Sequence, residues 1–218
     1  MRPAHDPHAR WVLIYRWIVF LLAAAAVIRQ VVIAGDYGNP GGPFRFLTNW
    51  ALLLSFFVAS RMLALTERRS DRHWPQLVAA TAVVNAMMVY LYWSLRLTDP
   101  ALVQSGPALP VYLDYYLHLI GPVLMWVDAF FIQDAFRRPW RSLPLLLGIV
   151  ALYVVWIEGF VGPFNIAPFG SVTSGLPYPF LNDLELAGRL AFYGQTTVGA
   201  VVVLAGMAGL AVVIRRRG

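Results

Sequence analysis

The sequence predicts an all-α integral membrane protein, a bundle of six transmembrane helices with both termini in the cytoplasm. Hydrophobic residues make up 59% of the chain, charged residues only 13%, and the mean hydropathy is +0.63. An average soluble domain carries about 25% charged residues, so lipid is the expected solvent here. A spanning helix needs about 20 mostly apolar residues, which limits the 218 residues to about five to seven crossings in one domain, 1–218.

The first expected helix covers residues 11–34 and ends at a run rich in glycine and proline, 35–43, which is typical of turns. A cleavable signal peptide is the alternative, because basic residues precede an apolar stretch that contains Ala23 to Ala26. The apolar character continues past these alanines to Ala34, which favours a helix that is retained.

The second and third expected helices cover residues 44–65 and 75–97, on either side of a charged loop, 67–73. Pro43 suits the start of the second helix, because proline lacks the amide hydrogen that first-turn positions leave unpaired. Several prolines between residues 98 and 110 then indicate a loop.

The last three expected helices cover residues 111–136, 140–160 and 184–214, the last two separated by a loop rich in glycine and proline, 162–179. The helix at 111–136 has the densest polar content of the six, namely Asp114, His118, Asp128, Gln133 and Asp134. Ionisable side chains are costly in hydrocarbon, so this helix is expected to face protein or water.

The arginines gather on one side of the expected bundle. They lie at both termini and in alternate loops, at Arg2 and Arg10, in 67–73, in 137–141 and in 215–217. Short loops rich in arginine stay in the cytoplasm, so both termini are expected there, which requires an even number of crossings and supports six. The loop 161–183 has no basic residue and is expected outside.

The net charge of +6 would suggest nucleic-acid binding in a soluble protein, but these arginines lie between apolar runs, so no nucleic acid is expected as a partner. The chain contains no lysine, and this absence, together with abundant alanine, valine and arginine, is typical of a bacterial protein. The expected location is the bacterial cytoplasmic membrane.

Metal and cofactor sites are not expected. The chain has no cysteine, which excludes disulfides and thiolate metal ligands. His118 falls within a helix, whereas His5, His8 and His73 are expected on the cytoplasmic side, away from it.

Thr48 and His118 are the candidate catalytic pair. Thr48 is expected about one turn into the second helix and His118 about two turns into the fourth, roughly 6 and 10 Å below the outer helix ends. A threonine hydroxyl becomes a nucleophile when a base such as a neutral histidine takes its proton. The early amides of the second helix are candidate donors to an oxyanion beside Thr48. The site is therefore expected towards the outer leaflet.

Two carboxylates are candidates for orienting His118. Asp114 precedes it by one helical turn and shares its face, and Glu158 is expected near the outer end of the fifth helix. Pro122 removes the hydrogen bond to the carbonyl of His118, so a kink and a free carbonyl are expected there.

Each of these residues also has a structural interpretation. The Thr48 hydroxyl could bond back to the Phe44 carbonyl, and Asp114 and Glu158 could be wetted interfacial carboxylates. Asp128 is expected nearer the membrane centre or inner half, in an ion pair or protonated. Arg189 could reach head groups or bind the carboxylate of a substrate.

Two other classes of protein remain open. A small transporter or channel would use Asp128, Glu158 and Arg189 as a polar path, and a lipid-binding protein would lack turnover. A hydrolase predicts instead one pocket that contains Thr48 and His118.

Four short segments, in order from residue 41 to the sixth helix, resemble the androgen-induced-gene and ADTRP family. They are 41–48 (GGPFRFLT), 113–118 (LDYYLH), 178–181 (YPFL) and 188–194 (GRLAFYG). The resemblance implies a multi-pass membrane hydrolase that cleaves fatty acid esters of hydroxy fatty acids with a threonine nucleophile and a histidine. Thr48 and His118 occupy the matching positions. The expected partners are a lipid ester and the surrounding membrane lipids, and the oligomeric state stays open.

Overall fold

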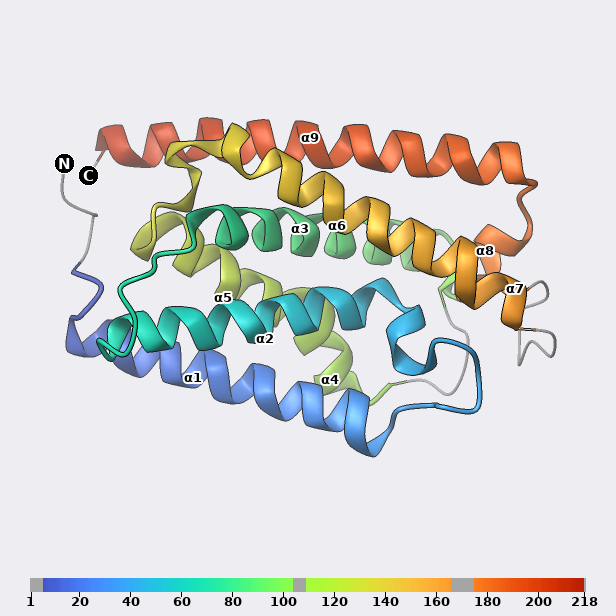
Figure 1. The fold of residues 1–218 in the computed structure, drawn as a ribbon, viewed down its shortest axis with the longest axis horizontal. Coiled ribbons are helices and arrows are strands. Elements are labelled where there is room, and N and C mark those ends of the chain that lie inside the picture. Colours follow the sequence, from blue (N-terminus) through green and yellow to red (C-terminus); the bar gives the residue numbers. More distant parts are fainter. Residues whose placement is uncertain (1–5, 104–108, 166–174, 218) are drawn as a thin grey trace.

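The chain forms an elongated bundle of long helices that run side by side in a computed structural model (Figure 1). The structure describes residues 6–103, 109–165 and 175–217. Six helices in these ranges are long and apolar enough to cross a membrane, at Arg10–Ile33, Leu47–Thr66, Pro75–Thr98, Val111–Ile132, Pro139–Phe164 and Leu186–Arg217. No strand occurs in the described residues. The prediction of an all-α, six-helix membrane protein is confirmed.

Several of the six spans contain more than one helical segment. The first is α1 (Arg10–Val27) followed by a π-helical turn, and the second and third are the unbroken helices α2 (Leu47–Thr66) and α3 (Pro75–Thr98). The fourth span alternates α4 (Val111–Tyr115), a π turn at Tyr116–Ile120, α5 (Gly121–Val127) and a π turn at Asp128–Ile132.

The fifth span begins with a 3-10 turn at Pro139–Arg141 and continues as α6 (Leu143–Trp156), a π turn and α7 (Gly162–Phe164). The short helix α8 (Pro179–Asn182) then precedes the long α9 (Leu186–Arg217). Both termini lie at one end of the bundle, and α7 and α8 lie at the other, here called the Thr48 end because α2 begins there (Figure 1).

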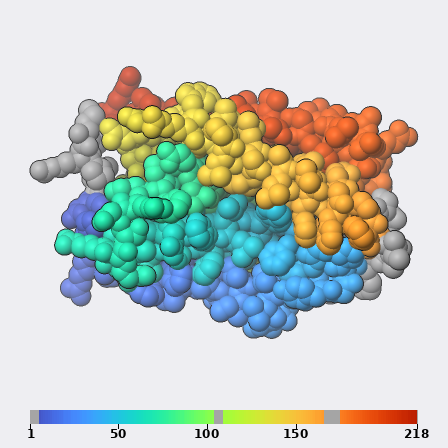
Figure 2. All heavy atoms as spheres, viewed as in Figure 1, coloured from blue at the N-terminus to red at the C-terminus, as the bar shows by residue number. Residues whose placement is uncertain are grey.

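The helix α3 lies at the centre of the bundle and contacts α2, α5, α6 and α9. Its buried face is rich in small side chains, which include Ala79, Ala80 and Ala82. Small residues let neighbouring helices approach closely, which is how packing holds membrane bundles together. On the face shown in Figure 2, the fifth span lies over the start of the second, at the Thr48 end.

A buried ion pair joins the first and fourth spans in the half of the bundle nearer the termini. The guanidinium of Arg16 binds both carboxylate oxygens of Asp128 at 2.8 Å and also donates to the carbonyl of Met62 and the hydroxyl of Thr66. Arg16 is only 1% exposed. The expectation of an ion pair at Asp128 is therefore confirmed.

The second helix begins at Leu47 rather than at residue 44. Gly42–Arg45 forms a separate 3-10 turn that contains Pro43 at its start, and the extended backbone of Phe46 separates this turn from α2. Thr48 is therefore the second residue of its helix, not one turn inside it.

Two other boundaries differ from the prediction by four residues. The fourth span ends at Ile132 instead of 136, because Asp134 adopts a left-handed backbone conformation that breaks the helix, so Gln133 and Asp134 lie beyond it. The fifth span continues to Phe164 instead of ending at 160, since Gly162 and Pro163 begin a further helical turn.

Candidate active site

Thr48 and His118 meet at the Thr48 end of the bundle. The hydroxyl oxygen of Thr48 lies 3.2 Å from Nε2 of His118, within hydrogen-bond distance. Thr48 comes from the first turn of α2, and His118 lies in the π turn Tyr116–Ile120 of the fourth span. His118 is 3% exposed, so its ring is shielded from solvent. The predicted meeting of the two residues is confirmed, although Thr48 sits closer to its helix end than expected.

Asp114 fixes the orientation of the His118 ring. Its carboxylate Oδ1 and its backbone carbonyl both lie 3.0 Å from Nδ1 of His118. Both of these oxygens are acceptors, so Nδ1 must carry the ring proton in the neutral imidazole. Nε2 is then unprotonated and presents its lone pair to the Thr48 hydroxyl.

Two side chains of α3 hold Asp114 in turn. The hydroxyl of Tyr92 donates to Oδ1 at 2.6 Å, and Nη1 of Arg96 donates to Oδ2 at 2.7 Å. Arg96 also hydrogen-bonds the Tyr92 hydroxyl. The Tyr92 ring stacks on His118, with ring centroids 3.4 Å apart and planes 7° from parallel. The histidine is thus held at its edge by Asp114 and on its face by Tyr92.

The main-chain carbonyl of His118 also has a defined partner. Pro122 cannot donate to it, and the indole Nε1 of Trp93 donates instead at 2.9 Å. This confirms the prediction that proline would release this carbonyl for another group. The hydrogen bond from Trp93 ties the π turn that contains His118 to the helix α3.

The turn before α2 is held by tryptophans from two helices. The Phe44 carbonyl accepts hydrogen bonds from Nε1 of Trp50 at 2.7 Å and of Trp156 at 3.0 Å. This is the carbonyl that the structural interpretation of Thr48 required. The observed partner of the Thr48 hydroxyl is His118 instead.

Tyr178 caps the start of α2. Its hydroxyl accepts the Leu47 amide at 2.9 Å, and burial raises the pKa of the Tyr178 phenol, so it is neutral at physiological pH. The main-chain amide of Asn49 donates to the Phe46 carbonyl. Of the early amides expected to stabilise an oxyanion, those of Leu47 and Asn49 therefore already have partners.

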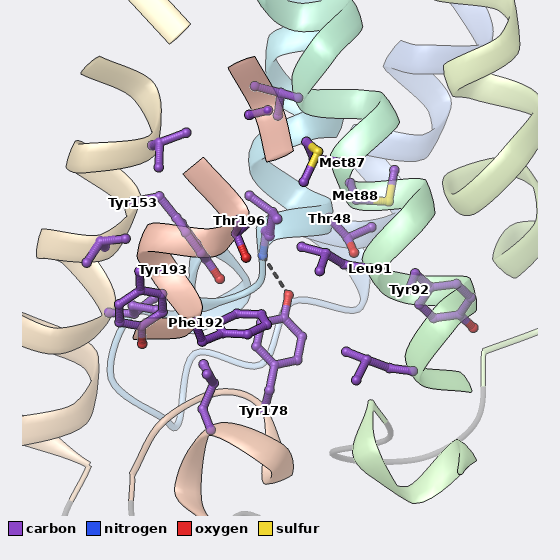
Figure 3. A pocket seen from close by; sticks show the side chains of 18 of the residues that line it. Thr48, Met87, Met88, Leu91, Tyr92, Tyr153, Tyr178, Phe192, Tyr193 and Thr196 are labelled. Carbon is purple, nitrogen blue, oxygen red and sulfur yellow. Dashed lines mark hydrogen bonds between the residues drawn. The ribbon is translucent and has the colours of Figure 1, made fainter. Parts of the chain in front are cut away.

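A pocket opens beside the Thr48 hydroxyl, between α3, α6 and α9 (Figure 3). It encloses about 980 Å³ of space, including its open mouth. Its polar side chains are Thr48, Tyr92, Tyr153, Tyr178, Tyr193 and Thr196. Aliphatic residues and methionines such as Met87, Met88 and Leu91 make up most of the remaining wall. An apolar pocket of this kind suits a lipid ligand.

Glu158 does not lie against His118, so its predicted role in orienting that ring is wrong. Its carboxylate binds Nε of Arg189 at 2.8 Å and Nη2 at 3.2 Å, and it accepts the Tyr193 hydroxyl at 2.7 Å. The physical reason is packing. Glu158 lies in the π turn Ile157–Val161 that follows α6, and it faces α9, whereas Asp114 occupies Nδ1 of His118.

Arg189 is likewise engaged within the protein. Besides its two bonds to Glu158, its Nη1 donates to the Leu184 carbonyl at 2.8 Å. A substrate carboxylate would have to displace Glu158 to bind Arg189, and the expected binding of a substrate carboxylate by Arg189 stays a prediction.

The three residues expected to form the polar path of a transporter take part in two separate ion pairs in this structure. Asp128 is bound by Arg16 near one end of the bundle, and Glu158 is bound by Arg189 near the other. Within the ranges that the structure describes, no group of three or more histidine, aspartate or glutamate side chains is placed to hold a metal ion.

Sequence reasoning missed Tyr92, Trp93 and Arg96. Their signal was the spacing at the end of the third helix, where Tyr92 and Arg96 are one turn apart and share a face. That face could not be assigned to His118 before the packing of α3 against the fourth span was known.

Comparison with known proteins identifies a family. The model of the family described as FAR-17a/AIG1-like protein matches residues 11–211. No curated protein matches the chain significantly, and no solved structure does.

Proposed function

This chain belongs to the FAR-17a/AIG1-like family, and we propose that it hydrolyses lipid esters inside the membrane. The observation that carries the proposal is the 3.2 Å contact of the Thr48 hydroxyl with Nε2 of His118, beside an apolar pocket. The substrate class implied by the resemblance of its motifs is fatty acid esters of hydroxy fatty acids.

The first step is attack on the ester carbonyl. The Thr48 oxygen forms a bond to the carbonyl carbon while Nε2 of His118 takes the hydroxyl proton. The carbonyl oxygen gains the electron pair and becomes an oxyanion. The positive charge that develops on His118 is balanced by Asp114, whose Oδ1 lies 3.0 Å from Nδ1.

The oxyanion then collapses and the bond to the alcohol oxygen breaks. His118 returns its proton to that oxygen, so the alcohol leaves neutral and the acyl group stays on Thr48. Water attacks the acyl-threonine in the second half, with His118 again as base, and the free acid leaves while Thr48 regains its proton.

Tyr92 and Arg96 act as positioning residues in this scheme. They donate to Asp114, which keeps the carboxylate directed at Nδ1 of His118. The stacked Tyr92 ring restricts rotation of the imidazole, so Nε2 stays aimed at Thr48. Preorganisation of this kind supplies much of the rate enhancement in acyl transfer.

The proposed location of the site is the outer leaflet of a bacterial cytoplasmic membrane. The loops rich in arginine gather at the opposite end of the bundle, and such loops usually lie in the cytoplasm. The chain has no cysteine, so single cysteines report sidedness cleanly. In intact cells, a membrane-impermeant maleimide is expected to label Asp183→Cys at the Thr48 end, and Asp71→Cys only after permeabilisation. The reverse pattern would refute this orientation.

Hydrolysis is tested on purified protein in detergent with a fluorogenic medium-chain ester and a fatty acid ester of a hydroxy fatty acid. Thr48→Ala and His118→Ala are expected to lower turnover per folded molecule about 10³-fold. Thr196→Ala is the matched control, because Thr196 lines the same pocket on α9. Turnover that survives both changes would disprove the pair, and no turnover by the unmodified protein would favour lipid binding.

A further inference from the structure

The pocket beside Thr48 is a long slot parallel to the helices. Its lining on α3 extends from Leu95 to Val84 and on the fifth span from Ile157 to Leu146, about 16 Å along each at 1.5 Å per residue. By contrast, α2 contributes only Leu47 and Thr48. Thr48 therefore lies near one end of the slot, and most of its length extends towards the middle of the bundle.

The far end of the slot is closed. Val84, Leu146 and Ala200 line it there and are 5%, 0% and 2% exposed. All three belong to the main hydrophobic core, and Leu204, one turn beyond Ala200 on α9, is fully buried. A chain that entered from the Thr48 end would meet packed side chains at this floor.

The two ends of the slot differ in polarity. The hydroxyls of Tyr153 and Tyr178 lie at the Thr48 end, where they bond to the main chain of Arg45 and Leu47. The floor is aliphatic, and Figure 3 shows Met87 and Met88 on the wall beyond Leu91, on the side away from Tyr178. This gradient matches a molecule with a polar ester at one end and a hydrocarbon tail at the other.

We propose that the slot binds the acyl chain of the ester and that Val84, Leu146 and Ala200 set the longest chain it accepts. The proposal rests on the proposed function and adds a specificity determinant to it. From Leu91, beside the Tyr92 that stacks on His118, to Val84 is about 10 Å along α3, which accommodates a chain of roughly eight carbons.

The acyl part, rather than the alcohol part, is assigned to the closed slot by the order of the reaction. The acyl group stays covalently bound to Thr48 through the second half of the reaction, so it needs no exit until water releases it. The alcohol leaves after the first half, so it cannot be the part that is held between Thr48 and the closed floor. A blind slot therefore suits the part of the ester that remains.

The test uses two ester series, one with acyl chains of increasing length on a constant alcohol and one with the reverse. Ala200→Leu fills the floor and is expected to lower the ratio of long-acyl to short-acyl turnover at least about tenfold, with the alcohol series unchanged. Leu146→Ala is expected to extend the accepted acyl length. Ala205→Leu, at an exposed position on α9, is the matched control and leaves both profiles unchanged.

A binding measurement separates this proposal from hydrolysis itself. In the Thr48→Ala background, brominated fatty acids of increasing length are titrated against tryptophan fluorescence. Addition of Ala200→Leu is expected to weaken binding of the long acids and spare the short ones, whether or not the unmodified protein turns over esters. Identical length profiles for Ala200→Leu and Ala205→Leu in both assays would overturn the slot assignment while leaving any observed hydrolysis intact.

Discussion

The fourth span carries two buried aspartates in opposite halves of the bundle. They differ in whether every hydrogen-bonding group of their partners is used within the cluster. Asp114 and Asp128 are each 5% exposed, and each binds an arginine. Arg16 closes the cluster at Asp128, since its guanidinium is fully engaged by the carboxylate, a carbonyl, a hydroxyl and the side-chain oxygen of Gln133. Asp114 also binds His118, whose second nitrogen faces a hydroxyl beside a pocket.

This comparison teaches that burial of a charge does not by itself mark a functional site. Both clusters lie at π turns of the same span, so irregular helix geometry does not separate them either. The difference is that one network ends on a base with an available lone pair, whereas the other satisfies every charge internally. The predictions below test that distinction.

The largest effect is expected for Asp114→Asn. An asparagine amide at this place would donate towards Nδ1 and favour the tautomer with a proton on Nε2, which cannot act as base. Turnover is expected to fall about 10³-fold or more, as for related changes in serine hydrolases, with little loss of folded protein. Steady-state kinetics and a thermal melt check both parts, and near-normal turnover would remove Asp114 from the mechanism.

The counterpart change, Asp128→Asn, is expected to act on stability alone. It leaves the Arg16 guanidinium buried without its carboxylate, which costs about 3–5 kcal/mol. Turnover per folded molecule is expected to stay near normal. A combined Arg16→Met and Asp128→Leu variant is the control, because removing both charges restores most of the stability. Lost turnover in that folded double variant would show that this cluster also serves catalysis.

A smaller effect is expected for Tyr92→Phe, which keeps the ring that stacks on His118 and removes the hydroxyl that bonds Asp114. Loss of one bond to a charged acceptor corresponds to about 1.5–3 kcal/mol, or roughly 10- to 100-fold in turnover if it acts on the transition state. The Michaelis constant for short esters is expected to change little. Tyr153→Phe, at another pocket hydroxyl, is the comparison variant, and equal losses in both would contradict a specific role for Tyr92.

The smallest effect concerns the loop before α2, where Asp36 binds Arg45 at 2.9 Å. Hydrogen bonds from Arg45 and Asn39 lower the pKa of Asp36 below its usual value. The pair therefore stabilises the folded state above the unfolded pKa of about 4 and loses this contribution as the pH falls through the lowered pKa.

Because Asp36 is largely exposed, Asp36→Asn is expected to lower the thermal midpoint by only about 1–2 °C at pH 7. Melts of both proteins between pH 7 and strongly acidic pH should converge as the carboxylate is protonated. A difference that persists at acid pH would assign the effect to something other than this charge.

The number of spans, their approximate limits and the Thr48–His118 pair were predictable from the sequence. Apolar length reports membrane crossing, and the position of a residue along a span reports its depth. Asp114 was predictable as well, because one helical turn places it on the face of His118. Span length, depth within a span and the spacing of one helical turn all depend on the number of residues between two positions, which can be counted in the sequence.

The tertiary structure decided which face each helix presents to its neighbours. Glu158 was predicted at a suitable depth for His118, yet it faces Arg189, and Tyr92 was overlooked although it lies on the imidazole. Rotation of a helix about its axis depends on which neighbours it packs against, and in lipid the apolar faces give little signal, because they are hydrophobic all round. The sequence by itself determined the class of protein and the candidate pair Thr48 and His118. Only packing determined which side chains hold this pair and which helices line the pocket beside it.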